Sequence, residues 1–209
     1  MDITIFVFLT SGVFLGWSFG ANHLGNVFGT AVGTRMLSLF TAAVIFSVFV
    51  ILGAVISGAG PAQTLGKLGA VNALAGAFMT ALSSGLTMFM MTRAGLPVSS
   101  TQAIIGGIVG WNLFSATVTD TVALTEIMIS WLAGPLLAAV MAMGLYALVK
   151  RFLQRTRIHL LRVDAYNRVG LIVAGAFGAY SLGANNIANV MGVFVNAVPF
   201  TDIQILGFE

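Results

Sequence analysis

The sequence contains no cysteine, and only 7% of its 209 residues carry a charge. Without cysteine, disulfides, thiolate chemistry and cysteine-ligated metal sites are excluded. A soluble domain carries about 25% charged residues, whereas this chain is 58% hydrophobic. These values exclude an ordinary soluble domain and predict a chain that lies in a lipid bilayer.

Acidic residues and histidines are too few to form an enzyme site. The chain has six Asp and Glu residues and two histidines, His23 and His159. No acidic pair stands on one face of a predicted span, so neither acid–base hydrolysis nor metal catalysis has candidate residues. We therefore predict that the protein is not an enzyme and carries no cofactor.

Basic residues are concentrated in one segment, because six of the nine Lys and Arg residues lie between positions 150 and 168. The positive-inside rule predicts that residues 151–168 form a cytoplasmic loop. A nucleic-acid surface is the alternative, but the segment has neither a folded domain nor interleaved aromatic residues. We expect contact with lipid headgroups and no nucleic-acid partner. The six residues are Lys150, Arg151, Arg155, Arg157, Arg162 and Arg168.

A short polar phrase occurs twice inside very apolar sequence, at residues 14–29 and again at residues 177–192. An internal repeat of this kind sets the architecture of the whole chain. The matched polar and small positions are Ser18 and Ser181, Gly20 and Gly183, Asn22 and Asn185, and Asn26 and Asn189.

The asparagines of this phrase are costly in hydrocarbon unless their amides are paired. Asn22 and Asn26 stand four residues apart and share a helix face, as do Asn185 and Asn189. A glycine two residues before each pair lets the backbone open, which would break the first span near Gly20, or lets another helix come close. Asparagine as a helix-packing residue is the alternative. Two matched copies favour a binding site between broken helices, the arrangement found in transporters.

The chain is predicted to be an all-α polytopic membrane protein, with inverted repeats, broken helices and a re-entrant hairpin. Two repeats are inverted only if the chain crosses the membrane an odd number of times between the two polar phrases. That number is odd whether residues 71–118 form a hairpin or two full spans. The basic loop, 150–168, then lies inside and the N-terminus outside the plasma membrane. The predicted spans are 3–34, 38–58, 127–149 and 169–198, with the hairpin or two spans at 71–118.

The predicted organisation is a first repeat over residues 1–150, the basic loop at 151–168 and the start of a second repeat over 169–209. The second phrase is followed by only residues 193–209, far fewer than follow the first. We expect a longer chain that supplies a second hairpin; completion of the site in a homodimer is the alternative.

Three motifs resemble the inorganic phosphate transporter family. They are the Gly-Ala-Asn-x-x-x-Asn phrases at 20–26 and 183–189, and the stretch Pro97-Val-Ser-Ser-Thr-Gln102 followed by a glycine-spaced helix at 103–110. The resemblance implies inverted repeats, re-entrant hairpins and uptake of phosphate coupled to sodium or protons. A smaller branch of that family is associated with sulfate.

The sequence departs from the family pattern at three positions. His23 and Asn186 stand where the family usually has Asp, and Gln102 stands where it usually has His. The missing carboxylates remove the anionic ligands that sodium, a hard cation, would favour, and leave the amide oxygens of Asn22 and Asn185 as possible sodium ligands. His23 offers proton coupling instead, or is a neutral histidine inside the bundle.

A tetrahedral oxyanion needs hydrogen-bond donors, and the motifs supply amides and hydroxyls. A helix that starts after Thr101 would add its N-terminal N–H groups. Ser18 and Ser181 either complete this site or pack helices, and Arg93 either pairs with the anion or lies at the surface. The predicted anion-binding residues are Asn22, Asn26, Ser99, Ser100, Thr101, Gln102, Asn185, Asn186 and Asn189.

We predict a secondary active transporter that imports inorganic phosphate across the plasma membrane, coupled to sodium or protons. The alternatives are a proton-coupled sulfate permease of the same family and an anion channel, in which the same donors would pass anions by repeated weak binding.

Overall fold

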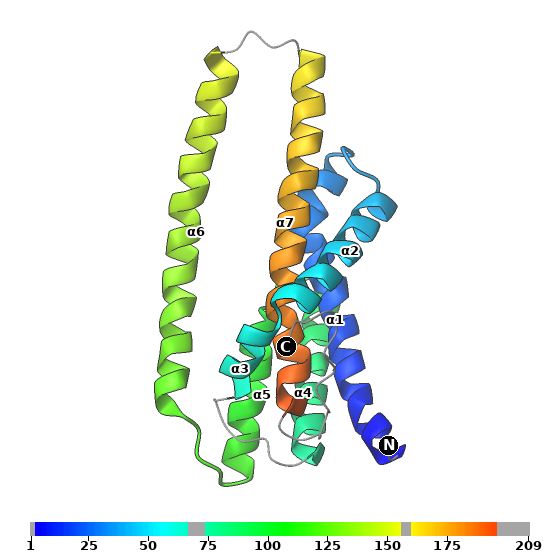
Figure 1. The fold of residues 1–209 in the computed structure, drawn as a ribbon, viewed down its shortest axis with the longest axis vertical. Helices are drawn as coiled ribbons and strands as arrows, with labels where there is room; N and C mark the ends of the chain where they lie inside the picture. The colour runs from blue at the N-terminus through cyan, green and yellow to red at the C-terminus, as the bar shows by residue number, and fades with distance from the viewer. Residues whose placement is uncertain (1–2, 67–73, 156–159, 196–209) are drawn as a thin grey trace.

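In the described parts of the chain, residues 3–66, 74–155 and 160–195, the computed structural model contains helices and no strands. Four of these helices are long and apolar enough to cross a membrane by length and composition, namely α2, α4, α6 and most of α7. The prediction of an all-helical membrane protein is therefore confirmed. The helices are α1 (Ile3–Gly33), α2 (Leu39–Ser57), α3 (Ala59–Gly66), α4 (Leu74–Arg93), α5 (Ser100–Phe114), α6 (Thr121–Arg155) and α7 (Leu160–Val195) (Figure 1).

Helices α1 and α7 run without interruption through the two polar phrases, so the predicted breaks near Gly20 and Gly183 are wrong. Neither helix contains proline, the commonest cause of a sharp kink. Gly183 instead permits close packing, because a Cβ at this position would collide with the backbone carbonyl of Val50 in α2. The α7 glycine therefore lets two helices approach rather than opening the backbone.

The predicted basic loop is largely helical. Helix α6 extends to Arg155 and α7 begins at Leu160, so the described part of the predicted loop 151–168 is helical rather than irregular. Lysine and arginine are good helix formers, and a helix that leaves the membrane has no reason to end at the first charge. Arg157 lies outside the described residues.

Helices α4 and α5 form an antiparallel pair whose connection, 94–99, lies beside the middle of α1. The ring centres of Phe8 in α1 and Phe78 in α4 lie 5.5 Å apart, and later in both helices Asn22 bonds to Thr92. Helices α1 and α4 therefore run in the same direction. Helix α5 then returns along α4. Its 15 residues span about 22 Å, which is shorter than the roughly 30 Å of a bilayer core. This geometry fits the hairpin alternative for 71–118, of which 71–73 lie outside the described residues.

Small residues hold the arms of this pair together. The Ser84 hydroxyl donates to the carbonyl of Ala103 at 3.0 Å, and a Cβ at Gly107 would lie 2.8 Å from the Ser84 oxygen. Near the open ends of the arms, a Cβ at Gly76 would overlap the indole of Trp111. The two helices are therefore locked in register by glycine contacts along their length.

Two apolar clusters form the core and fix the position of the hairpin. The first lies where α1, α4, α5 and α7 meet, and its fully buried members include Leu15, Met88, Ile104 and Phe194. The second joins α1, α2 and the first half of α7 around Phe28. Because the hairpin packs against both repeated phrases, its tip is held at their level.

Helix α6 stands apart from the rest of the bundle in Figure 1, and none of its residues is buried. A helix that is apolar and unburied around its whole circumference is typical of a membrane span. Residues near its start, Ala123, Leu124, Ile127 and Trp131, pack against the first apolar cluster.

Candidate functional site

The second phrase, on α7, is bonded directly to the start of α5. Asn189 is 1% exposed, and its Nδ2 donates to the hydroxyls of Thr101 at 3.1 Å and Ser100 at 3.3 Å. The same amide donates to Oδ1 of Asn186 at 3.0 Å, and the Ser100 hydroxyl donates to that oxygen at 2.8 Å. Asn185 reaches Thr101 Oγ1 at 3.5 Å. Five predicted residues therefore meet at one point.

The N-terminus of α5 opens into this cluster. Ser99 is its N-cap in extended conformation, and its hydroxyl accepts from the backbone N–H of Gln102 at 3.3 Å. The first backbone N–H groups of a helix have no partner within it and carry the positive end of its dipole. The side chains of Ser99 and Gln102 are exposed, whereas Ser100 is buried. The cluster therefore combines neutral side-chain donors with a helix N-terminus, the arrangement that suits an oxyanion.

The first phrase, on α1, is bonded to the other arm of the hairpin. Asn22 Nδ2 donates to the Thr92 hydroxyl at 3.1 Å, and Asn26 Nδ2 donates to Asn22 Oδ1 at 3.2 Å. Sequence reasoning did not identify Thr92, although it is the last hydroxyl residue before the hairpin tip. The two phrases therefore flank the hairpin, with α1 on the α4 arm and α7 on the α5 arm.

Two of the three positions that depart from the family pattern line one cavity. This cavity, of about 250 Å³, lies between α1, α2 and α7, and both His23 and Asn186 face it. His23 is 7% exposed, and its Nε2 has no hydrogen-bond partner. Its ring also meets that of Phe19 edge-on at 5.8 Å. Asn186 thus stands between the hairpin tip and a chamber that contains an unpaired imidazole nitrogen.

No carboxylate takes part in these contacts. Among the described residues, no group of three or more His, Cys, Asp or Glu side chains could hold a metal ion. The oxygens near the phrases are those of amides and hydroxyls, so a cation bound here would have only neutral ligands.

Three further sequence candidates lie outside the cluster. The Ser18 hydroxyl is buried and donates to the carbonyl of Phe14 at 2.9 Å in its own helix, while Ser181 is exposed. Arg93 is exposed, and its guanidinium lies over the ring of Phe89, 5.6 Å from the ring centre. Arg93 follows Thr92 directly, but it points to an aromatic surface rather than to the asparagines.

Comparison with known proteins gives a consistent result. Residues 19–205 match the model of the phosphate transporter family. A protein of Methanocaldococcus jannaschii named "Putative phosphate permease" is 29% identical over 94% of this chain and 62% of its own length. Sodium-dependent phosphate transporter 1 of Mus musculus is 27% identical over 91% of this chain and 27% of its own length.

A solved structure described as the sodium-dependent phosphate transporter has the same fold. Its TM-score is 0.76 at 21% sequence identity, with 95% of this chain and 70% of that chain covered. The chain spans 62% or less of the length of the relatives described here. Since the family model covers most of its residues, this chain belongs to the phosphate transporter family.

Proposed function

We propose that the protein imports inorganic phosphate across the cell membrane as a secondary active transporter. The observation that carries the proposal is the cluster in which Asn189 bonds to Ser100 and Thr101 at the N-terminus of α5. The family to which the chain belongs supports phosphate as the substrate. Names of two similar proteins describe them as sodium-dependent phosphate transporters.

The proposed anion site consists of donors that now bond to one another. Phosphate would accept hydrogen bonds from the α5 N-terminus, from the hydroxyls of Ser100 and Thr101, and from the amides of Asn185 and Asn189. Several present bonds are long, between 3.1 and 3.5 Å, so an anion with stronger acceptor oxygens would replace them. We include Asn22, Asn26, Ser99, Gln102 and Asn186 as residues of the surrounding site.

The hairpin would place this site within the membrane. In the proposed topology α4 and α5 enter and leave from one side, the N-terminus lies outside, and the basic ends of α6 and α7 lie inside. Residues 1–150 would form one repeat and 169–209 the start of an inverted one. Irregular backbone such as 94–99 is tolerated at membrane depth where it is buried in protein or faces a water-filled cavity.

The coupling ion is either sodium or a proton. Sodium would have to bind through neutral oxygens, of which those of Asn22 and Asn185 are candidates. Proton coupling would involve His23, because imidazole changes charge near neutral pH and this one lines the cavity beside Asn186. Both schemes place the coupling ion next to the anion cluster.

Uptake into proteoliposomes that contain the full-length protein tests the proposal. We expect saturable uptake of radioactive phosphate that follows an imposed gradient of sodium or of protons, and weak competition by sulfate. Stronger competition by sulfate would assign the protein to sulfate transport. Flux that does not saturate and ignores both gradients would indicate a channel, and absence of flux for either anion would contradict the proposal.

A further inference from the structure

A small pocket beside the hairpin tip contains a basic side chain that the proposed transport site does not use. The pocket has a volume of about 170 Å³ and lies between α1 and the last turns of α4. Arg93, which ends α4, is the only charged residue between positions 68 and 119 of the chain. The pocket therefore places a single positive charge beside the hairpin. Its lining residues are Trp17, Ser18, Phe89, Thr92 and Arg93.

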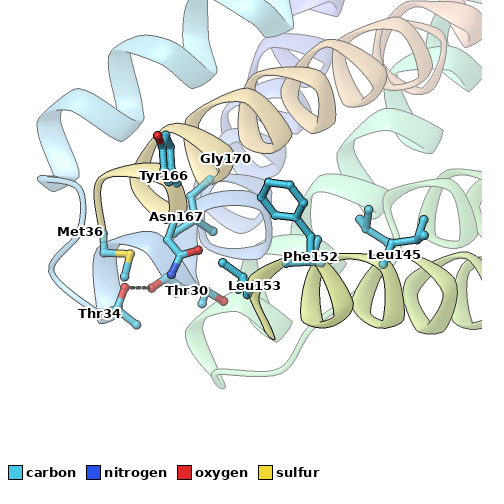
Figure 2. Close-up of a pocket in the computed structure, with 12 residues that line it drawn as sticks. Thr30, Thr34, Met36, Leu145, Phe152, Leu153, Tyr166, Asn167 and Gly170 are labelled. Atoms are coloured by element: carbon cyan, nitrogen blue, oxygen red, sulfur yellow. Dashed lines mark hydrogen bonds between the residues drawn. The ribbon is translucent and has the colours of Figure 1, made fainter. Parts of the chain in front are cut away.

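A larger groove, of about 1000 Å³, lies between the last half of α6 and the first half of α7 (Figure 2). None of the twelve residues that line it is charged. Since α6 exposes apolar side chains around its whole circumference, this groove has no group that would select one kind of occupant over another. The pocket at Arg93 does contain such a group.

The polar groups that the Arg93 pocket offers to a ligand are hydrogen-bond donors. A guanidinium group has only N–H donors and no acceptor. Among the described residues, Arg93 contacts the ring of Phe89, with Cζ 5.6 Å from the ring centre, and pairs with no carboxylate. The Thr92 hydroxyl accepts from Asn22 at 3.1 Å, and in the described parts of the chain no acceptor takes its own proton. A ligand of this pocket must therefore supply acceptor atoms and negative charge.

Aromatic rings hold the arginine at the pocket. The ring centres of Phe89 and Trp17 lie 5.9 Å apart, and Phe14 lies 6.1 Å from Trp17 and 6.2 Å from Phe89. A guanidinium that stacks on a ring keeps the N–H donors in its plane free for bidentate contact with an oxyanion. Stacking also restricts the rotation of the Arg93 side chain, which lowers the entropy lost when a ligand binds.

The proposed position of the hairpin makes a counter-charge at Arg93 necessary. In that topology the tip lies within the membrane, where an arginine without a partner is costly. The other polar side chain of the pocket, Ser18, is 2% exposed and donates its proton to the carbonyl of Phe14 in its own helix. With two donor residues and a volume of about 170 Å³, the pocket suits one small anion.

We propose that this pocket is a docking site for inorganic phosphate, at which the anion binds before it enters the Asn189 cluster. The inference rests on the proposed transport function. Arg93 would donate to two oxygens of the anion and Thr92 to a third. Arg93 and Ser100 lie at the two ends of the 94–99 connection, so the docking site is on the α1 side of the hairpin tip and the cluster on the α7 side. A positive charge at this place would raise the concentration of phosphate next to the cluster.

Equilibrium binding of radioactive phosphate to the purified full-length protein in nonionic detergent tests the proposal. We expect two phosphate sites per chain. Arg93→Gln should weaken one of them about 10- to 100-fold, because hydrogen bonds to a charged group are lost. Arg93→Lys, which keeps the charge but not the planar fork, should weaken the same site less. The double variant Ser100→Ala, Thr101→Val should affect only the other site, and Arg35→Gln, which changes an exposed arginine after the end of α1, is the control.

Uptake kinetics in proteoliposomes distinguish docking from transport. Arg93→Gln should raise the KM for phosphate about tenfold and leave kcat unchanged, since the cluster that carries the anion remains intact. A single phosphate site that Arg93→Gln does not alter would overturn this proposal while the proposed transport function stands, whereas absence of any phosphate binding would overturn both. The phosphate of a lipid headgroup has the same chemistry, so added phosphatidylglycerol that occupies the Arg93 site and excludes free phosphate would also overturn the proposal.

Discussion

The side-chain amide of Asn189 lies 3.1 Å from the Thr101 hydroxyl, and this contact joins the second polar phrase to the start of α5. The two residues are 88 positions apart in the chain. Asn189 is almost fully buried, so its amide must be paired, and the hydroxyls of Thr101 and Ser100 satisfy it. The same contact places the proposed anion donors around a helix N-terminus.

Asn189→Ala should strongly reduce phosphate uptake. The substitution removes a donor of the proposed site and leaves the two hydroxyls without their amide partner, at a cost of about 1–3 kcal/mol. We expect phosphate transport to fall by roughly 10- to 100-fold in proteoliposomes, with the protein still folded. Thr87→Ala, which removes a hydroxyl bonded only within α4, is the control. Unchanged uptake by Asn189→Ala would remove this residue from the site.

Thr92→Val should loosen the hairpin from α1. The change keeps the shape of the side chain but removes the hydroxyl that accepts from Asn22 at 3.1 Å. A hydrogen bond between membrane helices stabilises the protein by about 0.5–1.5 kcal/mol, so the free energy of unfolding in detergent should fall by that amount. Thr87→Val is the matched control on the same helix. Equal stability of the two variants would show that the Asn22 contact does not hold the hairpin.

The repeated glycines should respond differently to the same substitution. Gly183→Ala places a methyl group against the Val50 carbonyl in α2, and overpacking of this kind costs about 1–3 kcal/mol. Gly20→Ala, the corresponding change in α1, meets no atom within 4 Å and should change stability by less than about 0.5 kcal/mol. Thermal unfolding of both variants measures the difference. Equal effects would contradict the close approach of α2 and α7.

His23→Gln tests proton coupling. A proton-coupled carrier should take up phosphate faster as the pH falls between about 8 and 5.5, the range in which imidazole changes charge. If His23 carries the coupled proton, His23→Gln should remove that pH dependence, while His159→Gln should retain it. If uptake by His23→Gln and by His159→Gln requires sodium and has the same pH dependence in both, sodium coupling through neutral oxygens is favoured instead.

Local sequence patterns were sufficient to predict most of the helices. Apolar runs identified α1 and α2, and the polar stretch 97–102 between two apolar arms indicated either a hairpin or two spans. The matched phrases identified Asn185, Asn186 and Asn189, which the structure brings together with Ser100 and Thr101.

The errors came from features that depend on neighbouring helices. The sequence left Gly183 either as a break or as a point where another helix comes close, and only its contact with Val50 in α2 decides for close packing. The bond between Asn22 and Thr92 joins residues 70 positions apart, and no local pattern predicts such a pair. The predicted basic loop is mostly helical, because charge marks where a helix leaves the membrane and not where it stops.

Equilibrium binding of phosphate and sulfate to the purified full-length protein, with and without sodium, is the most direct test of the proposed site. The test compares the wild type with the double variant Ser100→Ala, Thr101→Val and with the control Ser83→Ala, Thr87→Val, whose hydroxyls bond only within α4. The account predicts that phosphate binds to the wild type and to the control, and that the tip variant binds it at least about tenfold more weakly. Phosphate binding that the tip variant retains in full, or binding of neither anion by the wild type, would contradict it.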